Sequence, residues 1–519
     1  MPECAIEILR SDGYTTQVTH PQKPGGVSPP LKADPSRVAF RRVFPGVMVS
    51  MFLAAVDQTI LASALPAIVA SLGGFADLSW VVVAYLLAAT VAAPLYGHFG
   101  DRFGRRRILL VALGVFTAAS LACAMAPTLW ALILSRAVQG LGGGGLMTLS
   151  QALIGESVAP RQRARFQGYF AALFATSSTL GPVLGALLTQ HFSWRAIFLV
   201  NLPLGLFAAA LALRIPRGPP PAMRDSRLDS LGIVLLALGT VSLFFALSSA
   251  GNRLPWNDLR LYGLLGFATI CLGALVMWER RTDHPVLPVQ LLASPIIWRS
   301  NATVICFAAA LFASVLYLPL YLQLGRGVGI GESGLLLLPL TLSIAAASGL
   351  TGRAISRTGR INAYAKIGLT VSTVALLALA ATVSIAPTSV VLALTVIAGA
   401  GLGTVMAPTQ IIVQSASGNA RLGAAVASIS VSRSIGGSLG VAIVGALLFV
   451  LVGNQSELLA TVLPQLAESG GAALASLSEA QRSEIAANLD GAFRVIFFVI
   501  AAFAGAGAVI ASTVPAQKL

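Results

Sequence analysis

Apolar runs long enough to cross a lipid bilayer recur along most of this 519-residue sequence, and short polar loops separate them. A spanning helix needs about 20 mostly apolar residues. Windows of that length place fourteen candidate spans at 44–69, 79–99, 107–126, 128–152, 166–190, 196–215, 230–250, 259–278, 300–324, 333–351, 362–385, 388–412, 425–452 and 493–512. Only 10% of the residues are charged, against roughly 25% in ordinary soluble domains, which excludes a soluble globular protein. The sequence therefore predicts an all-α membrane protein with 14 transmembrane helices.

The charges of the loops predict the orientation of these helices. The loop between the second and third spans, GHFGDRFGRRR at 97–107, is the most polar short segment of the apolar region. An excess of Lys and Arg in short loops is typical of the cytoplasmic side. Placing both termini in the cytoplasm assigns most of the 34 Lys and Arg to cytoplasmic loops and span edges. The net charge of +15 therefore reflects membrane topology, and we expect no nucleic-acid partner, because the arginines form no single basic face.

An internal repeat divides the chain into two halves of six spans. One constant offset aligns Gly97, Arg102, Gly104, Arg105, Gly181 and Gly185 with Gly352, Arg357, Gly359, Arg360, Gly436 and Gly440. In transporters built from such repeats, the substrate site lies between the halves near the bilayer midplane. We expect a disordered cytoplasmic tail at 1–42, an N-terminal six-helix half at 43–215, a linker with two inserted transmembrane helices at 216–299, a C-terminal six-helix half at 300–512 with an external loop at 453–491, and a cytoplasmic tail at 513–519.

Four motifs carry a family resemblance. The loop at 97–107 resembles the signature GxLaDrxGrkxxl of the major facilitator superfamily, and LSRAVQG at 134–140 resembles its lxxxRxxqG element. The segment GPVLG at 181–185 resembles the antiporter element GPxxG. The segment VDQTILASALP at 56–66 is similar to LDxTIVNVALP of the fourteen-helix drug:proton antiporters, with Ala62 in place of the Asn. The resemblance implies the major facilitator fold, with two six-helix halves plus two inserted helices. It also implies a multidrug efflux antiporter that exports drugs in exchange for protons.

Asp57 and Arg136 are the candidate proton-coupling residues. An Asp inside a spanning helix costs roughly 2.5 to 3.5 kcal/mol on insertion scales, so such residues are functional candidates by default. At 1.5 Å per residue, Asp57 in the first span and Arg136 in the fourth reach similar depths near the midplane. Burial favours the neutral carboxyl and a nearby guanidinium favours the carboxylate, so relative movement of the two would bind and release a proton. The alternatives are a static structural ion pair and a solvated cavity wall. The expected driving force is the proton gradient, with no cofactor.

Other polar side chains in the spans are candidates for the wall of a substrate cavity. They are Gln58, Gln139, Asn201, Tyr317, Tyr321, Gln323, Gln410, Gln414 and Arg433. Arg433 has no acid in its own span, and two roles stay open for it: contact with substrate or gate, and snorkelling toward the cytoplasm. Because the second-half spans hold no acid comparable to Asp57, the sequence favours monovalent or neutral substrates over dications.

The charged loop and its repeat are predicted to form a cytoplasmic gate. Its candidate residues are Gly97, Asp101, Arg102, Gly104, Arg105, Glu156, Arg357 and Arg360. The two loops differ at Asp101, whose equivalent is Ser356. We expect Asp101 to hold the gate closed by pairing with arginines or with a helix N-terminus of the other half. The glycines have a simpler explanation in the backbone needs of a turn. Glu156 is interpreted as a structural partner of the arginine-rich loops, and a role in relaying protons is the alternative.

Glycine-rich segments inside the spans are interpreted as helix-packing sites. Gly181, Pro182 and Gly185 form the antiporter element, for which we expect tight packing of the fifth span that limits proton leak; ordinary helix packing is the alternative. The run at 140–145 formally contains GxGxxG, but a dinucleotide site needs a preceding strand and a helix N-terminus. The segment GGSLG at 436–440 matches GxSxG, yet it lies inside a span and not on a strand-to-helix turn.

The sequence favours a secondary active transporter over an enzyme or a receptor. The four histidines are dispersed, the cysteines lack metal-ligand spacing, and no HExxH or GxxxxGK[ST] element occurs, so we expect no metal site and no direct ATP drive. The leading interpretation is a proton-coupled exporter of amphiphilic compounds in the bacterial cytoplasmic (inner) membrane. A proton-coupled transporter of a specific metabolite, siderophore or lipid stays open. Expected partners are small amphiphilic substrates, protons and membrane lipid; a periplasmic or outer-membrane export partner is compatible with this, and we expect a monomer.

Overall fold

The computed structural model describes residues 42–73, 79–158, 160–216, 229–249, 254, 258–282, 292–326, 328, 330–418, 421–453 and 479–515, and the long apolar segments in these ranges are predominantly helical. The helices of the first half are α2 (Phe44–Ile60), η1 (Leu61–Ser63), α3 (Leu65–Leu72), α4 (Ser79–Phe103), α5 (Arg105–Ala124), α6 (Leu129–Ser157), α7 (Pro160–His191), α8 (Ala196–Leu199) and α9 (Asn201–Leu213). The inserted helices are α10 (Ser230–Ser249) and α11 (Leu259–Glu279). The second half contains α13 (Pro295–Leu324), α14 (Ile330–Leu335), α15 (Leu338–Thr358), α16 (Asn362–Thr382), α17 (Thr388–Gly403), α18 (Met406–Ser417), α19 (Leu422–Gly453) and α22 (Glu479–Thr513).

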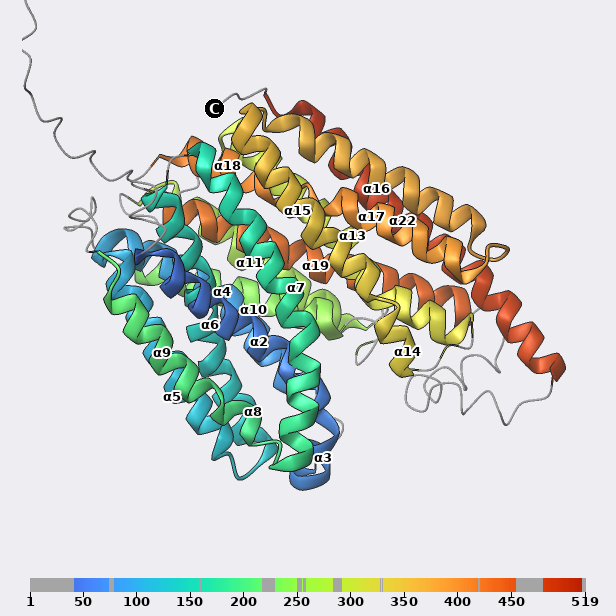
Figure 1. The fold of residues 1–519 in the computed structure, drawn as a ribbon, viewed down its shortest axis with the longest axis horizontal. Coiled ribbons are helices and arrows are strands. Elements are labelled where there is room, and N and C mark those ends of the chain that lie inside the picture. The colour runs from blue at the N-terminus through green and yellow to red at the C-terminus, as the bar shows by residue number, and fades with distance from the viewer. Residues whose placement is uncertain are drawn as a thin grey trace, which may run out of the picture.

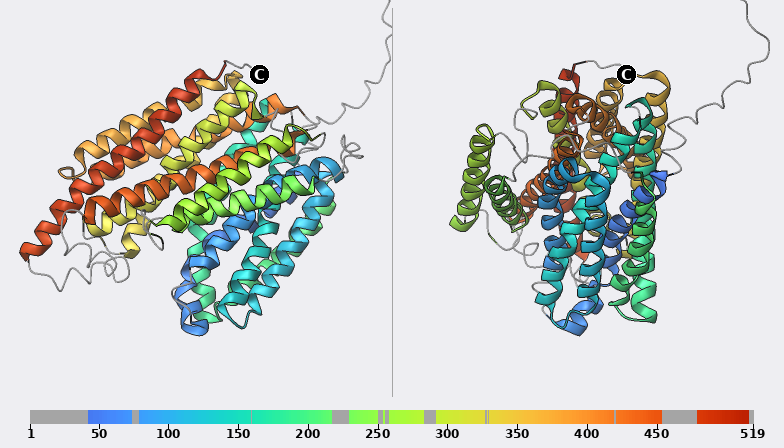
Figure 2. Two further views of the ribbon diagram at one scale, coloured as in Figure 1. Left: turned by 180° about the vertical axis from the view of Figure 1, so that it is seen from behind. Right: turned by 90° about the vertical axis from the view of Figure 1, so that its left-hand side faces the viewer.

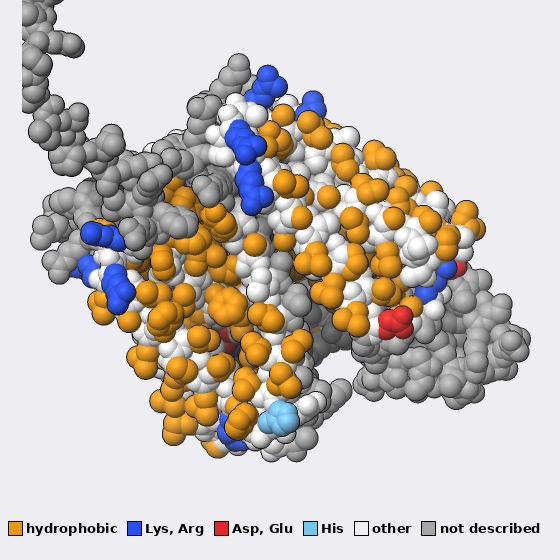
Figure 3. Space-filling model, in the orientation of Figure 1, with side chains coloured by type: hydrophobic (Ala, Val, Ile, Leu, Met, Phe, Trp, Pro, Cys, Tyr) orange, Lys and Arg blue, Asp and Glu red, His pale blue; other side chains and the backbone are white. Residues whose placement is uncertain are grey.

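The all-helical membrane architecture predicted from the sequence is confirmed. Ten helices within the described ranges are long and apolar enough to cross a membrane. A helix satisfies its own backbone hydrogen bonds, which hydrocarbon cannot do. Hydrophobic side chains cover much of the visible surface, and Lys and Arg gather mainly toward one end (Figure 3). The number of 14 crossings stays a prediction. Residues 1–41 of the expected tail, the greater part of the external loop at 453–491 and the last four residues lie outside the described residues.

The two halves repeat the same helix contacts. In the first half α4 and α5 pack on α6, α2 packs on α7, and α9 packs on both α2 and α5. Their counterparts in the second half make the equivalent contacts: α15 and α16 pack on α17, α13 on α19, and α22 on both α13 and α16. This correspondence is what a duplicated six-helix unit produces, and it agrees with the repeat detected in the sequence.

The halves meet along two symmetric seams. One seam joins α7 to α15, and the other joins α4 to α19. The bundles lie together near the C-terminal end of the chain and diverge toward α3 and α14 (Figure 1). The inserted pair α10 and α11 lies on the outside of the bundle, where α10 contacts α4 and α19 (Figure 2). The Trp80 and Phe245 rings stack there with centroids 5.1 Å apart.

In both copies of the charged loop, the glycine between the two helices has a positive φ. Gly104, between α4 and α5, has a φ of 93°, and Gly359, between α15 and α16, has a φ of 68°. A residue with a Cβ is strained in this region, whereas glycine enters it at little cost. The backbone requirement of the two turns therefore explains why the repeat keeps these glycines.

Glycines also allow close helix packing within each half. A Cβ atom on Gly140 would lie 2.3 Å from the carbonyl oxygen of Tyr85, so α6 approaches the backbone of α4 directly. In the second half, a Cβ on Gly436 would lie 2.2 Å from the carbonyl oxygen of Ile305 in α13. Both runs are therefore helix-packing surfaces, as the sequence analysis expects for GxGxxG and GxSxG segments inside a span.

We predict that Gly140→Ala destabilises the protein, because the new methyl group meets backbone that cannot move aside independently. Overpacking of this kind costs about 1 to 3 kcal/mol. The measurement is the midpoint of thermal unfolding of the purified protein in detergent. Gly114→Ala in α5 is the matched control, since no heavy atom lies within 4 Å of its added Cβ. An equal midpoint for the two variants would contradict the prediction.

Candidate functional site

Asp57 and Arg136 form an ion pair inside the N-terminal half. The Arg136 Nη1 atom donates to Asp57 Oδ2 at 2.6 Å, and each of the two residues is 1% exposed. Asp57 is supplied by α2 and Arg136 by α6. The equal depth expected from their positions along the two helices is therefore realised as direct contact. Removing one partner of such a pair leaves an uncompensated charge, which costs about 3 to 5 kcal/mol.

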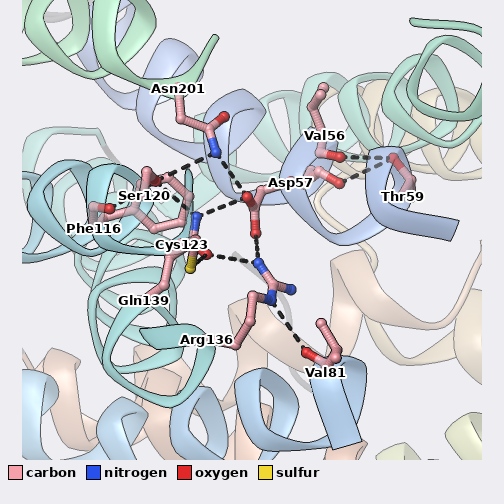
Figure 4. Close-up of polar contacts among 11 residues, drawn as sticks. Val56, Asp57, Thr59, Val81, Phe116, Ser120, Cys123, Arg136, Gln139 and Asn201 are labelled. Atoms are coloured by element: carbon pink, nitrogen blue, oxygen red, sulfur yellow. Dashed lines mark hydrogen bonds and ion pairs between the residues drawn. The ribbon is translucent and has the colours of Figure 1, made fainter. Parts of the chain in front are cut away.

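Three neutral side chains complete the hydrogen bonding of this pair (Figure 4). Gln139 Nε2 and Asn201 Nδ2 each donate to Asp57 Oδ1 at 2.8 Å. Arg136 Nη1 also donates to Gln139 Oε1 at 2.7 Å, and Gln139 Nε2 donates to the Ser120 hydroxyl at 2.7 Å. The carboxylate thus receives donors from α6 and α9, while Ser120 adds α5 to the same network.

Helix α4 fixes the position of the Arg136 guanidinium. Arg136 Nε donates to the carbonyl oxygen of Val81 at 3.2 Å, and its Cζ lies 4.3 Å from the centroid of the Tyr85 ring. A cation over an aromatic face is attracted by the ring quadrupole, more strongly when water is excluded. Five helices, α2, α4, α5, α6 and α9, therefore converge on one buried charge pair.

Helix α7 packs directly against the turn that follows Asp57. A Cβ on Gly181 would lie 2.0 Å from Thr59 Oγ1, and one on Gly185 would lie 2.3 Å from the carbonyl oxygen of Ile60. The Thr59 hydroxyl donates to the carbonyl oxygen of Ser177 at 2.9 Å. The antiporter element therefore contacts α2 one turn beyond the ion pair. Pro182 lies in α7, and its side chain falls outside the described part of the structure.

A cavity of about 430 Å³ lies between the two halves. Its N-terminal wall comes from α2, α4, α6 and α7, and its C-terminal wall from α13, α15, α17, α18 and α19. Gln58 lines it, whereas its neighbour Asp57 points into the first half. Most lining side chains are apolar, and Phe170, Phe174, Phe307 and Phe312 contribute aromatic surface. This size and composition are typical of a site for a small molecule.

The structure divides the predicted cavity residues into two groups. Gln58, Gln410 and Arg433 line the cavity. Gln139 and Asn201 do not, because both bind Asp57. Tyr317 and Tyr321 donate to the backbone carbonyls of Val441 and Val383 within the second half, Gln414 is buried beside Gly155, and Gln323 is not among the lining residues. The apolar-polar pattern of a span cannot distinguish these cases, since its rotation depends on packing.

Asp101 bridges the two halves at the charged loop. Its Oδ2 accepts from the backbone N–H of Gly423 at 3.0 Å and from that of Ala424 at 3.4 Å, and both donors lie in the first turn of α19. Arg105 Nη2 donates to Asp101 Oδ1 at 2.6 Å. The contact thus combines a helix N-terminus of the other half with an arginine of the same loop. A carboxylate at a helix N-terminus is favoured by the helix dipole and by the unpaired N–H groups.

The remaining gate candidates differ in their surroundings. Arg105 Nη1 donates to Glu156 Oε2 at 2.7 Å, which links α5 to the end of α6. Arg102 lies over the Phe103 ring at 4.8 Å. Arg357 and Arg360 are exposed at the end of α15 and its turn. Gly97 meets Gly423 across the seam, where an added Cβ would lie 2.6 Å from the Gly423 carbonyl oxygen.

Several contacting residues have no distinct sequence signal. Ser120 is a partner of both Gln139 and Asn201. Gln151 of α6 hydrogen-bonds to Gln410 of α18 and so joins the two walls of the cavity. Each is a polar residue within an apolar span, which does not distinguish it from other such residues, and only the packing shows which partner it meets.

Comparison with known proteins agrees with this architecture. Residues 47–441 match the family model described as Major Facilitator Superfamily. The chain is 30% identical over 452 residues to the Multidrug transporter protein MdtP of Bacillus subtilis, covering 87% of this chain and 83% of that protein. It is 34% identical over 409 residues to the Uncharacterized MFS-type transporter Rv1877 of Mycobacterium tuberculosis, covering 78% of this chain but only 59% of that relative.

The fold resembles that of a solved transporter. The proton:xylose symporter XylE, described as a major facilitator superfamily protein, superposes with a TM-score of 0.60 at 13% identity, covering 93% of this chain and 97% of that chain. At this identity the likeness concerns the fold alone.

We predict that Asp101→Asn shifts the molecule toward states in which the seam between α4 and α19 is open. The amide keeps the size of the side chain but loses the charge-assisted hydrogen bonds to Arg105, Gly423 and Ala424, each worth about 1.5 to 3 kcal/mol. Distances between spin labels on the 97–107 loop and the equivalent 352–360 loop report the populations. Ser356→Ala, at the repeat-equivalent position, is the matched control. Unchanged distance distributions in Asp101→Asn would refute the role of Asp101 in holding the gate closed.

Proposed function

Because the chain belongs to the major facilitator superfamily, and is therefore a multi-pass membrane transporter and not an enzyme, we propose that it exports amphiphilic compounds in exchange for protons. The observation that carries the proposal is the separation of two sites. A carboxylate held by an arginine is buried in one half, and a largely apolar cavity lies between the halves next to it. The name of the relative MdtP, a multidrug transporter, supports the export of such compounds.

In this proposal Asp57 is the proton acceptor. Protonation of its carboxylate removes the charge that Arg136 Nη1 contacts and weakens the hydrogen bonds from Gln139 and Asn201. Thr59, one half-turn away in α2, contacts α7, which also lies on a seam between the halves. In this proposal, a change at Asp57 is therefore transmitted to the α7–α15 seam through direct contacts between α2 and α7.

Asp101 acts as the gate residue in the proposed cycle. The carboxylate closes the α4–α19 seam in the state described by the structure, while the other ends of the two bundles diverge. Alternating access then requires these contacts to break as the halves rock about the cavity. We propose that the charged-loop end faces the cytoplasm of a bacterial inner membrane, with both termini on that side, and that a monomer transports without a cofactor or metal.

We predict that Asp57→Asn abolishes proton-driven efflux, because the Asn side chain does not bind and release a proton at physiological pH. The assay uses inverted vesicles energised with a proton gradient, a panel of neutral, anionic and cationic amphiphilic dyes, and a pH-sensitive readout of proton flux. Asp258→Asn, at the N-terminus of α11, is the control and is expected to transport normally.

A second variant separates loss of coupling from loss of folding. Asp57→Asn alone leaves Arg136 unpaired, whereas Asp57→Asn with Arg136→Gln removes both charges and is expected to recover part of the lost thermal stability. Both variants should lack proton-coupled efflux while reaching the membrane in amounts similar to the unsubstituted protein. Gradient-driven efflux at the normal rate in either variant would refute the assignment of Asp57.

A further inference from the structure

Arg433 lies on the wall of the central cavity, and no described residue forms an ion pair with it. Among the described residues that line the cavity, it carries the only charge. The ion pairs of the described chain involve Arg105 with Asp101 and Glu156, and Arg136 with Asp57; none involves Arg433, and no hydrogen bond of the described residues does. This contrasts with Arg136, whose guanidinium forms an ion pair with Asp57 and donates to Gln139 and Val81.

The position of Arg433 argues against snorkelling to the membrane surface. The residue lies about three turns into α19, counted from Leu422. Its neighbour Ser434 accepts a hydrogen bond from Thr90 of α4 at 3.2 Å, which ties this turn of α19 to the opposite half. Ser430 and Ser434 line the cavity beside it. The guanidinium is therefore presented to the space between the halves.

Aromatic surface lies next to this charge. Phe312 of α13 packs over Gly437, one helical turn beyond Arg433, where an added Cβ would lie 2.9 Å from the Phe312 ring. Phe307 lines the cavity from the same helix, and Phe170 and Phe174 face it from α7. The cavity therefore combines one cationic group with apolar and aromatic walls.

We propose that the cavity selects amphiphiles with a single negative charge, held by Arg433 through a carboxylate, sulfonate or similar anionic group. A charge taken out of water needs a partner, and the described lining supplies none, so the substrate provides it. The planar guanidinium presents paired N–H donors that match such oxyanions. Cationic amphiphiles meet an uncompensated like charge and are disfavoured. This specificity rests on the proposed export function, but binding to the cavity does not require proton coupling.

The test is equilibrium binding to the purified full-length protein in nanodiscs of zwitterionic lipid, without a proton gradient. Two fluorescent probes share one aromatic framework: 1-anilinonaphthalene-8-sulfonate is anionic, and N-phenyl-1-naphthylamine lacks the sulfonate. Ethidium serves as a cationic probe. We expect the anionic probe to bind more tightly than the other two. Arg433→Gln should weaken the binding of the anionic probe by roughly 10- to 100-fold, the loss expected for a charge-assisted hydrogen bond. The affinity for the neutral probe should stay unchanged.

Two controls make the result specific. Arg433→Lys keeps the charge but loses the paired donors, so it should retain part of the preference for the anion. Arg260→Gln removes an exposed arginine of α11 and should change the affinity for neither the anionic nor the neutral probe. The proposal is overturned if Arg433→Gln leaves the affinity for the anionic probe unchanged, if both probes weaken equally, or if ethidium binds the unsubstituted protein most tightly. If one of these binding outcomes occurs while efflux still depends on Asp57, only the proposed substrate class is refuted, and the proposed export function is not.

Discussion

The contact between Asp57 and Arg136 is the interaction on which the first half depends. Each charge alone would be costly in hydrocarbon, and the pair is stabilised further because Gln139 and Asn201 donate to Asp57 while the Val81 carbonyl accepts from Arg136. Those partners come from several helices, so the pair also fixes how these helices are rotated. The packing glycines of α6 and α7 serve the same arrangement, since they bring α4 and α2 close enough for the contacts to form.

Much of this fold could be predicted from residue order alone. Helix lengths and depths follow from a constant rise per residue, and they placed Asp57 and Arg136 at one level before any packing was known. The duplication was visible because Gly104 and Gly359 meet the same backbone requirement in both copies. The partition of the polar residues was not predictable in this way. Gln139 binds Asp57 while Gln410 lines the cavity, and this difference depends on helix rotation, which is set by neighbours distant in sequence.

The two halves share one packing plan but carry different chemistry. The first contains the buried acid, the second contains the cavity arginine, and only the first copy of the charged loop carries a carboxylate, at Asp101. The inserted pair adds a further difference, because α10 contacts the α4–α19 seam. Duplication thus supplied two similar frameworks, and the charged residues made them unequal. In the proposed cycle, this inequality assigns proton binding to one half and binding of the transported molecule to the interface between both.

The glycine contacts across the seams have a consequence for the rate of opening. Gly97 meets Gly423 on one seam and Gly168 meets Gly349 on the other, so at these points backbone touches backbone. No rotamers interlock there, and separation needs no side chain to change its conformation. The activation barrier should then be determined mainly by the few polar groups that cross the interface, with Asp101 foremost. A single carboxylate would in that case control how often the transporter turns over, although it contacts neither Asp57 nor the cavity.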